Sequence, residues 1–197
     1  MPVRVVIPLA AVAAVLLGAG VWLLTRGDTP RPAAFRAEPT SALYTLIDSR
    51  QRDAAPLTPA EVFTPATERL GALKRGQTEQ FADCGEALAG VDAPGCTQAL
   101  RAAYTGDGVA GQFVIFNLSD GRAADALVAA LGKDGFVGQA VTFDASRSRA
   151  EARAMGHYVT VSWAGATRSG AAPDLVPTLI ALDGLGRVVQ GRVIAAT

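Results

Sequence analysis

The stretch CTQALRAAYTGDGVAGQFVIFNL, residues 96–118, decides the fold of this 197-residue chain. Two runs suited to β-strands flank Gly106-Asp107-Gly108, and Asp-Gly between such runs is a strong signal for a tight hairpin. The second run contains FVIF at residues 113–116, which places apolar side chains on both faces of the strand. We therefore expect a hairpin whose second strand is central in a well-covered sheet.

A helix and then a strand are predicted next along the chain. Ser119 or Asp120 can cap the helix, and Gly132 ends it. Between them, apolar residues recur at positions 124, 127, 128 and 131, which is the spacing of one helix face. Residues 136–143 are suited to a strand.

A second hairpin and a last helix follow. Residues 149–155 and 158–164 flank Gly156-His157, and the second of these runs alternates in polarity as a strand does. Leucines and valines spaced by three or four positions over residues 174–193 predict one long amphipathic helix. Strands joined by tight turns and separated by only two helices favour an α+β fold. We expect a mostly antiparallel sheet with helices packed on one face.

The amino-terminal segment is apolar and long. Residues 5–24 read VVIPLAAVAAVLLGAGVWLL and carry no charge. A helix of this length spans roughly 30 Å, which is the thickness of the hydrocarbon core of a bilayer. We therefore predict a transmembrane helix over residues 5–25, after a cytoplasmic stub of residues 1–4. The small residues at positions 18–20 leave a cleaved signal peptide as the alternative.

A linker and one domain complete the predicted organisation. Residues 26–39 are rich in proline, and in an extended conformation they could hold a domain about 40 Å from the membrane. Residues 40–197 then form a single α+β domain. Within it, Thr58 and Glu61 match a capping box with Pro59 at the first helical position.

The location of the domain follows from weaker signals. The short stub of residues 1–4 is typical of a signal anchor, which favours a single-pass protein of the cell membrane with its domain outside the cytoplasm. Counting Arg26, Arg31 and Arg36 by the positive-inside rule favours the opposite orientation, with the domain in the cytoplasm. The first orientation is our prediction, and it makes the lipid bilayer a partner through residues 5–25.

Composition excludes some classes of function. Without Arg4 and Arg26, the 18 basic residues of the chain become 16, which against 18 acidic residues leaves a net charge of −2. The chain has no surplus of basic residues of the kind that would indicate binding to nucleic acid. The sequence also contains no motif typical of nucleotide binding, zinc proteases or serine hydrolases, so no cofactor is expected.

Cys84 and Cys96 are the only cysteines. Two cysteines and a single histidine cannot complete a zinc site, so no metal is expected, and their spacing is not that of a redox CxxC motif. In a domain outside the cytoplasm the expected state is a disulfide, worth about 3 kcal/mol in the chain-entropy model. Two reduced thiols in a cytoplasmic domain are the alternative.

Few residues are candidates for chemistry. His157 is the only histidine, and its position in a hairpin turn predicts a solvated residue rather than a catalytic base. Arg147, Arg149 and Arg153 fall on one face of an alternating strand together with Glu151. This row could contact an anionic ligand, although it is more typical of the solvated face of an edge strand. We therefore predict no catalytic residues.

Four short stretches carry a resemblance. They are LTPAEVF at residues 57–63, DC at 83–84, GCTQALRAAY at 95–104 and GHYVTVSWAG at 156–165. Together they resemble a group of uncharacterised, single-pass membrane proteins of high-GC Gram-positive bacteria. The resemblance implies an anchored domain with a paired Cys84 and Cys96, and it implies no activity and no site residue.

The sequence therefore predicts a binding or interaction module, tethered outside the membrane and acting as an accessory or sensory partner of other envelope proteins. The alternative is an envelope enzyme, such as a hydrolase, that uses Asp, Ser or Tyr side chains in a site without a known motif. A cleft with converging titratable groups of shifted pKa would favour the enzyme.

Overall fold

The computed structural model describes residues 29–197. The predicted stub of residues 1–4 and the predicted transmembrane helix of residues 5–25 lie outside the described residues. Across residues 29–197, the structure contains no helix with the length and apolar character needed to cross a membrane.

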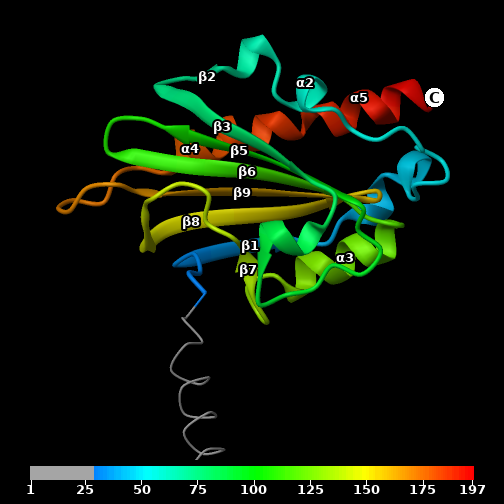
Figure 1. Ribbon diagram of the computed structural model, residues 1–197, viewed down its shortest axis with the longest axis horizontal. Coiled ribbons are helices and arrows are strands. Elements are labelled where there is room, and N and C mark those ends of the chain that lie inside the picture. The colour runs from blue at the N-terminus through cyan, green and yellow to red at the C-terminus, as the bar shows by residue number, and fades with distance from the viewer. Residues whose placement is uncertain (1–28) are drawn as a thin grey trace, which may run out of the picture.

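A seven-stranded sheet organises the domain (Figure 1). All neighbouring strands are antiparallel except at one edge, where the first strand of the described residues pairs parallel with β8. Across the sheet the order is β1 (Ala34–Glu38), β8 (Asp144–Met155), β9 (Tyr158–Ala166), β6 (Val109–Asn117), β5 (Gln98–Thr105), β3 (Leu73–Phe81) and β2 (Arg69–Leu70). The α+β fold with a mostly antiparallel sheet is thus confirmed.

The hairpin predicted over residues 96–118 is formed by β5 and β6. Gly108 at its turn has a φ of +76°, a conformation that glycine adopts without steric cost. Strand β6 lies fourth of the seven, in the middle of the sheet. Phe113 and Ile115 point into one hydrophobic core, and Val114 and Phe116 point into the other. The predicted central strand is therefore confirmed.

Helices cover both faces of the sheet, so the prediction of helices on one face is wrong. Helix α3 (Gly121–Ala130) packs on the core that contains Trp163, and Asp120 caps it by accepting a hydrogen bond from Ala123 N. Helices α4 (Val176–Asp183) and α5 (Arg187–Ala195) pack on the opposite core, as Figure 1 shows. Since β6 and β9 are buried along their length on both faces, a single helical layer could not cover them.

Local details differ from the predicted elements in two places. The last helix is divided into α4 and α5 by a 3-10 turn at Gly184–Gly186, because glycine stabilises a continuous helix poorly. The strand predicted over residues 136–143 is limited to β7 (Phe136–Val137), which pairs with β4 (Leu88–Ala89) in a separate two-stranded ribbon. Helix α2 (Pro59–Val62) has the predicted capping box, formed by Thr58 and Glu61.

Strand β1 comes from the segment that the sequence assigned to the linker. Its residues pair with Arg149–Arg153 of β8, and the ring of Phe35 lies edge-on against the ring of Phe136 at a centroid distance of 5.2 Å. A prediction based on proline content misses this strand, because its pairing partner lies more than a hundred residues away. Part of the segment assigned to the linker is therefore a strand of the sheet.

The disulfide between Cys84 and Cys96 is formed, with sulfur atoms 2.04 Å apart. It joins the 3-10 turn Cys84–Ala87 to the residues that lead into β5. Asp83 caps that turn by accepting a hydrogen bond from Gly85 N. The disulfide thus joins the two ends of the connection between β3 and β5 to each other.

Candidate functional site

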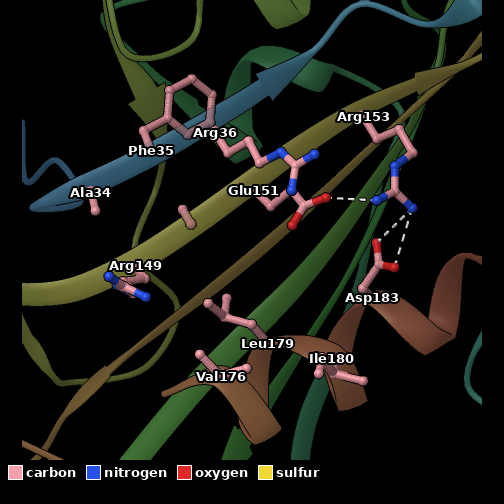
Figure 2. A pocket seen from close by; sticks show the side chains of 11 residues that line it. Ala34, Phe35, Arg36, Arg149, Glu151, Arg153, Val176, Leu179, Ile180 and Asp183 are labelled. Atoms are coloured by element: carbon pink, nitrogen blue, oxygen red, sulfur yellow. Dashed lines mark hydrogen bonds and ion pairs between the residues drawn. The ribbon is translucent and has the colours of Figure 1, made fainter. Parts of the chain in front are cut away.

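A groove of about 490 Å³ runs between β1, β8 and α4 (Figure 2). We call it the β1–α4 groove. Strands β1 and β8 form its floor, and α4 forms one wall. Because side chains alternate along a strand, Arg149, Glu151 and Arg153 of β8 share the face that lies in the groove. The groove thus contains two of the three arginines that the sequence singled out.

Arg153 joins three elements at one end of the groove. Its guanidinium lies 2.6 Å from a carboxylate oxygen of Glu38 on β1 and 2.6 Å from one of Glu151 on β8. It also lies 3.2 Å from Asp183 on α4. Burial lowers the pKa of Arg153, but the hydrogen bond to Glu38 and the three carboxylates outweigh burial, so the pKa is raised. Arg153 therefore connects β1, β8 and α4. Its positive charge is balanced by carboxylates of the protein itself.

Arg149 lies at the mouth of the groove and is exposed. Within residues 29–197 its guanidinium takes part in no ion pair, while the other two arginines of the row are engaged. Arg147 instead donates hydrogen bonds to the carbonyl oxygens of Arg168, Gly170 and Ala171, at 2.7, 2.9 and 3.1 Å. Of the three predicted contacts for an anionic ligand, Arg149 alone presents its charge to the solvent.

The interpretation of this row as the face of an edge strand is wrong. Strand β8 lies between β1 and β9, and β1 is the edge of the sheet. The arginines therefore sit beside a strand edge rather than on it. The sequence could not show this, because the strand that covers β8 was assigned to the linker.

Apolar side chains of α4 line the wall of the groove. Ile180 is 68% exposed and Val176 is 44% exposed, and both point toward the opening together with the half-buried Leu179 (Figure 2). Large apolar side chains are usually covered in a monomeric domain, and a contiguous exposed group of them is typical of an interaction site. The groove therefore offers an apolar wall beside a cationic side chain.

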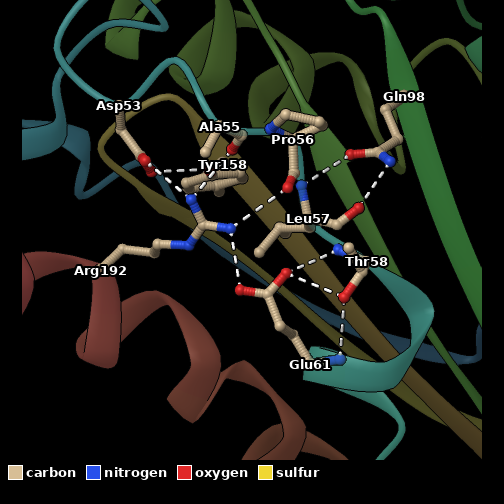
Figure 3. A network of polar contacts seen from close by, with 9 residues as sticks. All are labelled: Asp53, Ala55, Pro56, Leu57, Thr58, Glu61, Gln98, Tyr158 and Arg192. Atoms are coloured by element: carbon tan, nitrogen blue, oxygen red, sulfur yellow. Dashed lines mark hydrogen bonds and ion pairs between the residues drawn. The ribbon is translucent and has the colours of Figure 1, made fainter.

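A second polar cluster lies on the same side of the sheet but is closed (Figure 3). Arg192 of α5 contacts Asp53 at 2.9 Å and Glu61 at 3.0 Å, and it donates hydrogen bonds to the carbonyl oxygens of residues 55–56. Tyr158 of β9 donates its hydroxyl to Asp53 at 2.7 Å. These contacts fasten the loop of residues 53–61 onto the sheet and onto α5.

The titratable groups of this cluster stabilise one another. Burial and the neighbouring Asp53 raise the pKa of Tyr158, so its hydroxyl keeps its proton. Burial raises the pKa of Glu61, but hydrogen bonds from Thr58 and the charge of Arg192 outweigh it and the pKa is lowered. The hydrogen bond from the protonated Tyr158 to Asp53 is therefore structural. A tyrosine that keeps its proton is a poor nucleophile.

His157 is buried, so the prediction of a solvated turn residue is wrong. Its side chain is fully covered, its Nδ1 lies 2.8 Å from the carbonyl oxygen of Ile47, and its ring lies 4.0 Å from that of Tyr158. Because a carbonyl only accepts, Nδ1 carries the proton. Burial lowers the pKa of His157, so the ring is neutral. The segment around Ile47, distant in sequence, covers the turn.

The groove combines an apolar wall, an exposed arginine and carboxylates that are paired with Arg153. Within residues 29–197, no three His, Cys, Asp or Glu side chains are placed to hold a metal ion. The apolar wall of α4 and the partners Glu38 and Asp183 were missed by sequence reasoning. The exposed Val176 and Ile180 could have been noticed as apolar residues four positions apart at the start of the last helix.

Comparisons with known proteins add no relative: no protein-family model matches the chain, and neither does any curated protein or solved structure.

Proposed function

We propose that this protein is a membrane-tethered binding module outside the cytoplasm, with an accessory or sensory role. The β1–α4 groove receives a segment of another envelope protein. The observation that carries this proposal is the groove itself, where an exposed apolar wall faces a sheet edge and an unpaired arginine. Tethering rests on the apolar run of residues 5–24.

The edge strand supports an extended peptide as the ligand. Strand β1 is the last strand of the sheet, so in the described part of the chain its outer edge has no strand partner. An extended segment can add to such an edge through main-chain hydrogen bonds, while pockets for alternate side chains give specificity. Val176 and Ile180 would contact the apolar side chains of that segment, and Arg149 would contact a carboxylate.

The alternative of an envelope hydrolase has less support. The carboxylates in the groove, Glu151 and Asp183, are paired with Arg153 rather than facing a nucleophile. Tyr158 and Asp53 are bonded to each other under the loop of residues 53–61. An enzyme that used these groups would first have to break the contacts that hold α4 and α5 on the sheet.

Site-specific photocrosslinking in membranes tests the proposal. A photoreactive amino acid is placed at Ile180 or at Ile194, which is 74% exposed on α5 outside the groove and provides a matched control. We expect a discrete crosslinked protein from position 180, none from position 194, and loss of the product when Arg149→Glu is added. Equal crosslinking from the two positions would contradict a role for the groove.

A further inference from the structure

The chain is fastened to the domain from residue 29 onward. Arg31 donates hydrogen bonds to the carbonyl oxygens of Gly132, Lys133 and Asp134, at 3.4, 3.1 and 3.1 Å. The backbone N–H of Ala33 then donates to the carbonyl oxygen of Ala145 at 3.2 Å. Residues 29–33 therefore run along the surface of the domain before β1 begins.

Thr29 meets the domain at a second turn beside the first. A Cβ built on Gly90 would lie 3.7 Å from Thr29 Oγ1 and 3.4 Å from the carbonyl oxygen of Asp134. The turn at Gly90 and the turn of residues 132–135 are thus neighbours, and the chain enters between them. We call this surface, formed by Thr29, Arg31, Gly90 and residues 132–135, the entry face.

The attached segment shortens the tether. With residues 5–25 in the bilayer, only residues 26–28 connect the membrane to the entry face. Four Cα–Cα steps join residue 25 to residue 29, and a fully extended chain spans about 14 Å over that length. The linker of residues 26–39, taken as fully extended, allowed roughly three times that separation.

We infer that the entry face lies against the lipid headgroups. This inference rests on the proposed membrane tether. The headgroup layer on each side of a bilayer is about 5–8 Å thick, so the tether leaves roughly 6–9 Å between the entry face and the surface of that layer. A helix with its side chains is about 10–12 Å across, so no layer of protein fits in that space. The bilayer is therefore the partner of this face.

The net charge of the entry face is small, so the tether and not electrostatic attraction holds this face near the membrane. Arg31 and Lys133 are opposed by Asp134, and all three are exposed, so the face carries one net positive charge. One basic residue near an anionic surface contributes only about 1 kcal/mol of attraction, which is too little to hold a domain on the membrane. The domain released from its tether is therefore not expected to bind vesicles, and the position of the entry face depends on the length of residues 26–28.

A fluorophore close to the membrane reports this position. The full-length protein is reconstituted into vesicles that carry nickel chelated on their headgroups, a quencher that acts at short range. The dye is attached to Lys133→Cys on the entry face or to Gln190→Cys on α5, across the sheet. Both native cysteines are in the disulfide, so each variant has a single reactive thiol.

We expect a large loss of fluorescence at position 133 and a small one at position 190. An insertion of about 20 Gly/Ser residues between Gly27 and Asp28, with a mean span of roughly 25 Å, should reduce the loss at position 133 toward that at 190. Equal quenching at the two positions in a vesicle-bound protein would overturn the inference and leave the tether standing. A full-length protein that does not enter vesicles would overturn the proposed tether and the inference with it.

Discussion

Glu38 and Arg153 lie 115 positions apart in the sequence, and their side chains meet at 2.6 Å. Because the Arg153 side chain is only 27% exposed, the contact is partly shielded from water. Two further carboxylates share the same guanidinium, so its removal leaves three acidic groups close together. This ion-pair cluster is where β1, β8 and α4 are joined.

Replacing Arg153 with methionine should lower the free energy of unfolding by about 1.5–3 kcal/mol, the range for hydrogen bonds to charged groups. Arg149→Met is the matched control on the same strand face, and it should change stability by less than about 0.5 kcal/mol because Arg149 has no ion pair to lose. Urea denaturation of residues 29–197 measures both values. If the two variants lose equal stability, the ion pairs of Arg153 contribute nothing beyond the packing of its aliphatic stem.

His157 should make the stability of the domain depend on pH. Burial lowers its pKa in the folded state below the ordinary value of 6.5, so the unfolded chain binds the proton first. Its contribution is complete above pH 6.5 and declines as the pH falls toward the lowered pKa, by at most about 1.4 kcal/mol per pH unit. Since the chain has one histidine, His157→Gln should remove this slope, and an unchanged slope would assign it to other groups.

Two hairpin glycines should respond differently to alanine. Gly108 and Gly156 both have a positive φ, +76° and +60°, which costs an alanine about 1–2 kcal/mol. A Cβ at Gly108 meets open space, whereas one at Gly156 collides with the backbone of Ile47. Gly156→Ala should therefore destabilise the domain clearly more than Gly108→Ala in thermal denaturation. Similar losses would show that the segment at Ile47 moves away freely.

The amino-terminal boundary of the ordered domain can be tested by truncation. A protein starting at residue 29 should be monomeric and fold cooperatively. One starting at residue 40, the boundary predicted from sequence, loses β1, exposes the edge of β8 and uncovers Phe136, which costs about 2 kcal/mol or more. Size-exclusion chromatography and urea denaturation compare the two. Equal behaviour would mean that β1 is dispensable.

The disulfide between Cys84 and Cys96 should stabilise the domain measurably. It closes a loop over a sequence separation of 12, for which loop-closure entropy gives about 3 kcal/mol. The paired substitution of both cysteines by serine should lower the urea midpoint, and adding a reductant should then have no further effect. A reductant that destabilises the double variant as much as the wild type would be acting elsewhere.

The hairpins and helix α3 could be predicted from sequence because their signals are local. Asp107-Gly108 specifies a turn, and Asp120 caps a helix whose apolar residues repeat with the helical period. The face of the sheet on which α4 and α5 pack could not be predicted. The apolar stripe of a helix shows that the helix packs on a core, but it does not indicate which face of the sheet the helix covers. Strand β1 was missed because it depends on pairing with the distant β8.

The candidate site divides in the same way. The alternation of side chains along β8 predicted that Arg149 and Arg153 share one face, and both line the groove. The partners that neutralise Arg153 could not be found, because Glu38 and Asp183 come from segments that meet it only in the folded protein. His157 was misjudged for a similar reason, since the chain around Ile47 covers its turn.

Strand β1 has a mechanical consequence. It joins the sheet through a single neighbour, and its first residue follows directly on the segment that leads from the proposed anchor. Tension between the membrane and whatever occupies the groove would reach the fold first through the bonds of Arg31 and then through β1. Because β1 is also part of the groove floor, peeling it away would dismantle the binding surface, so a pull of sufficient force would release the bound partner.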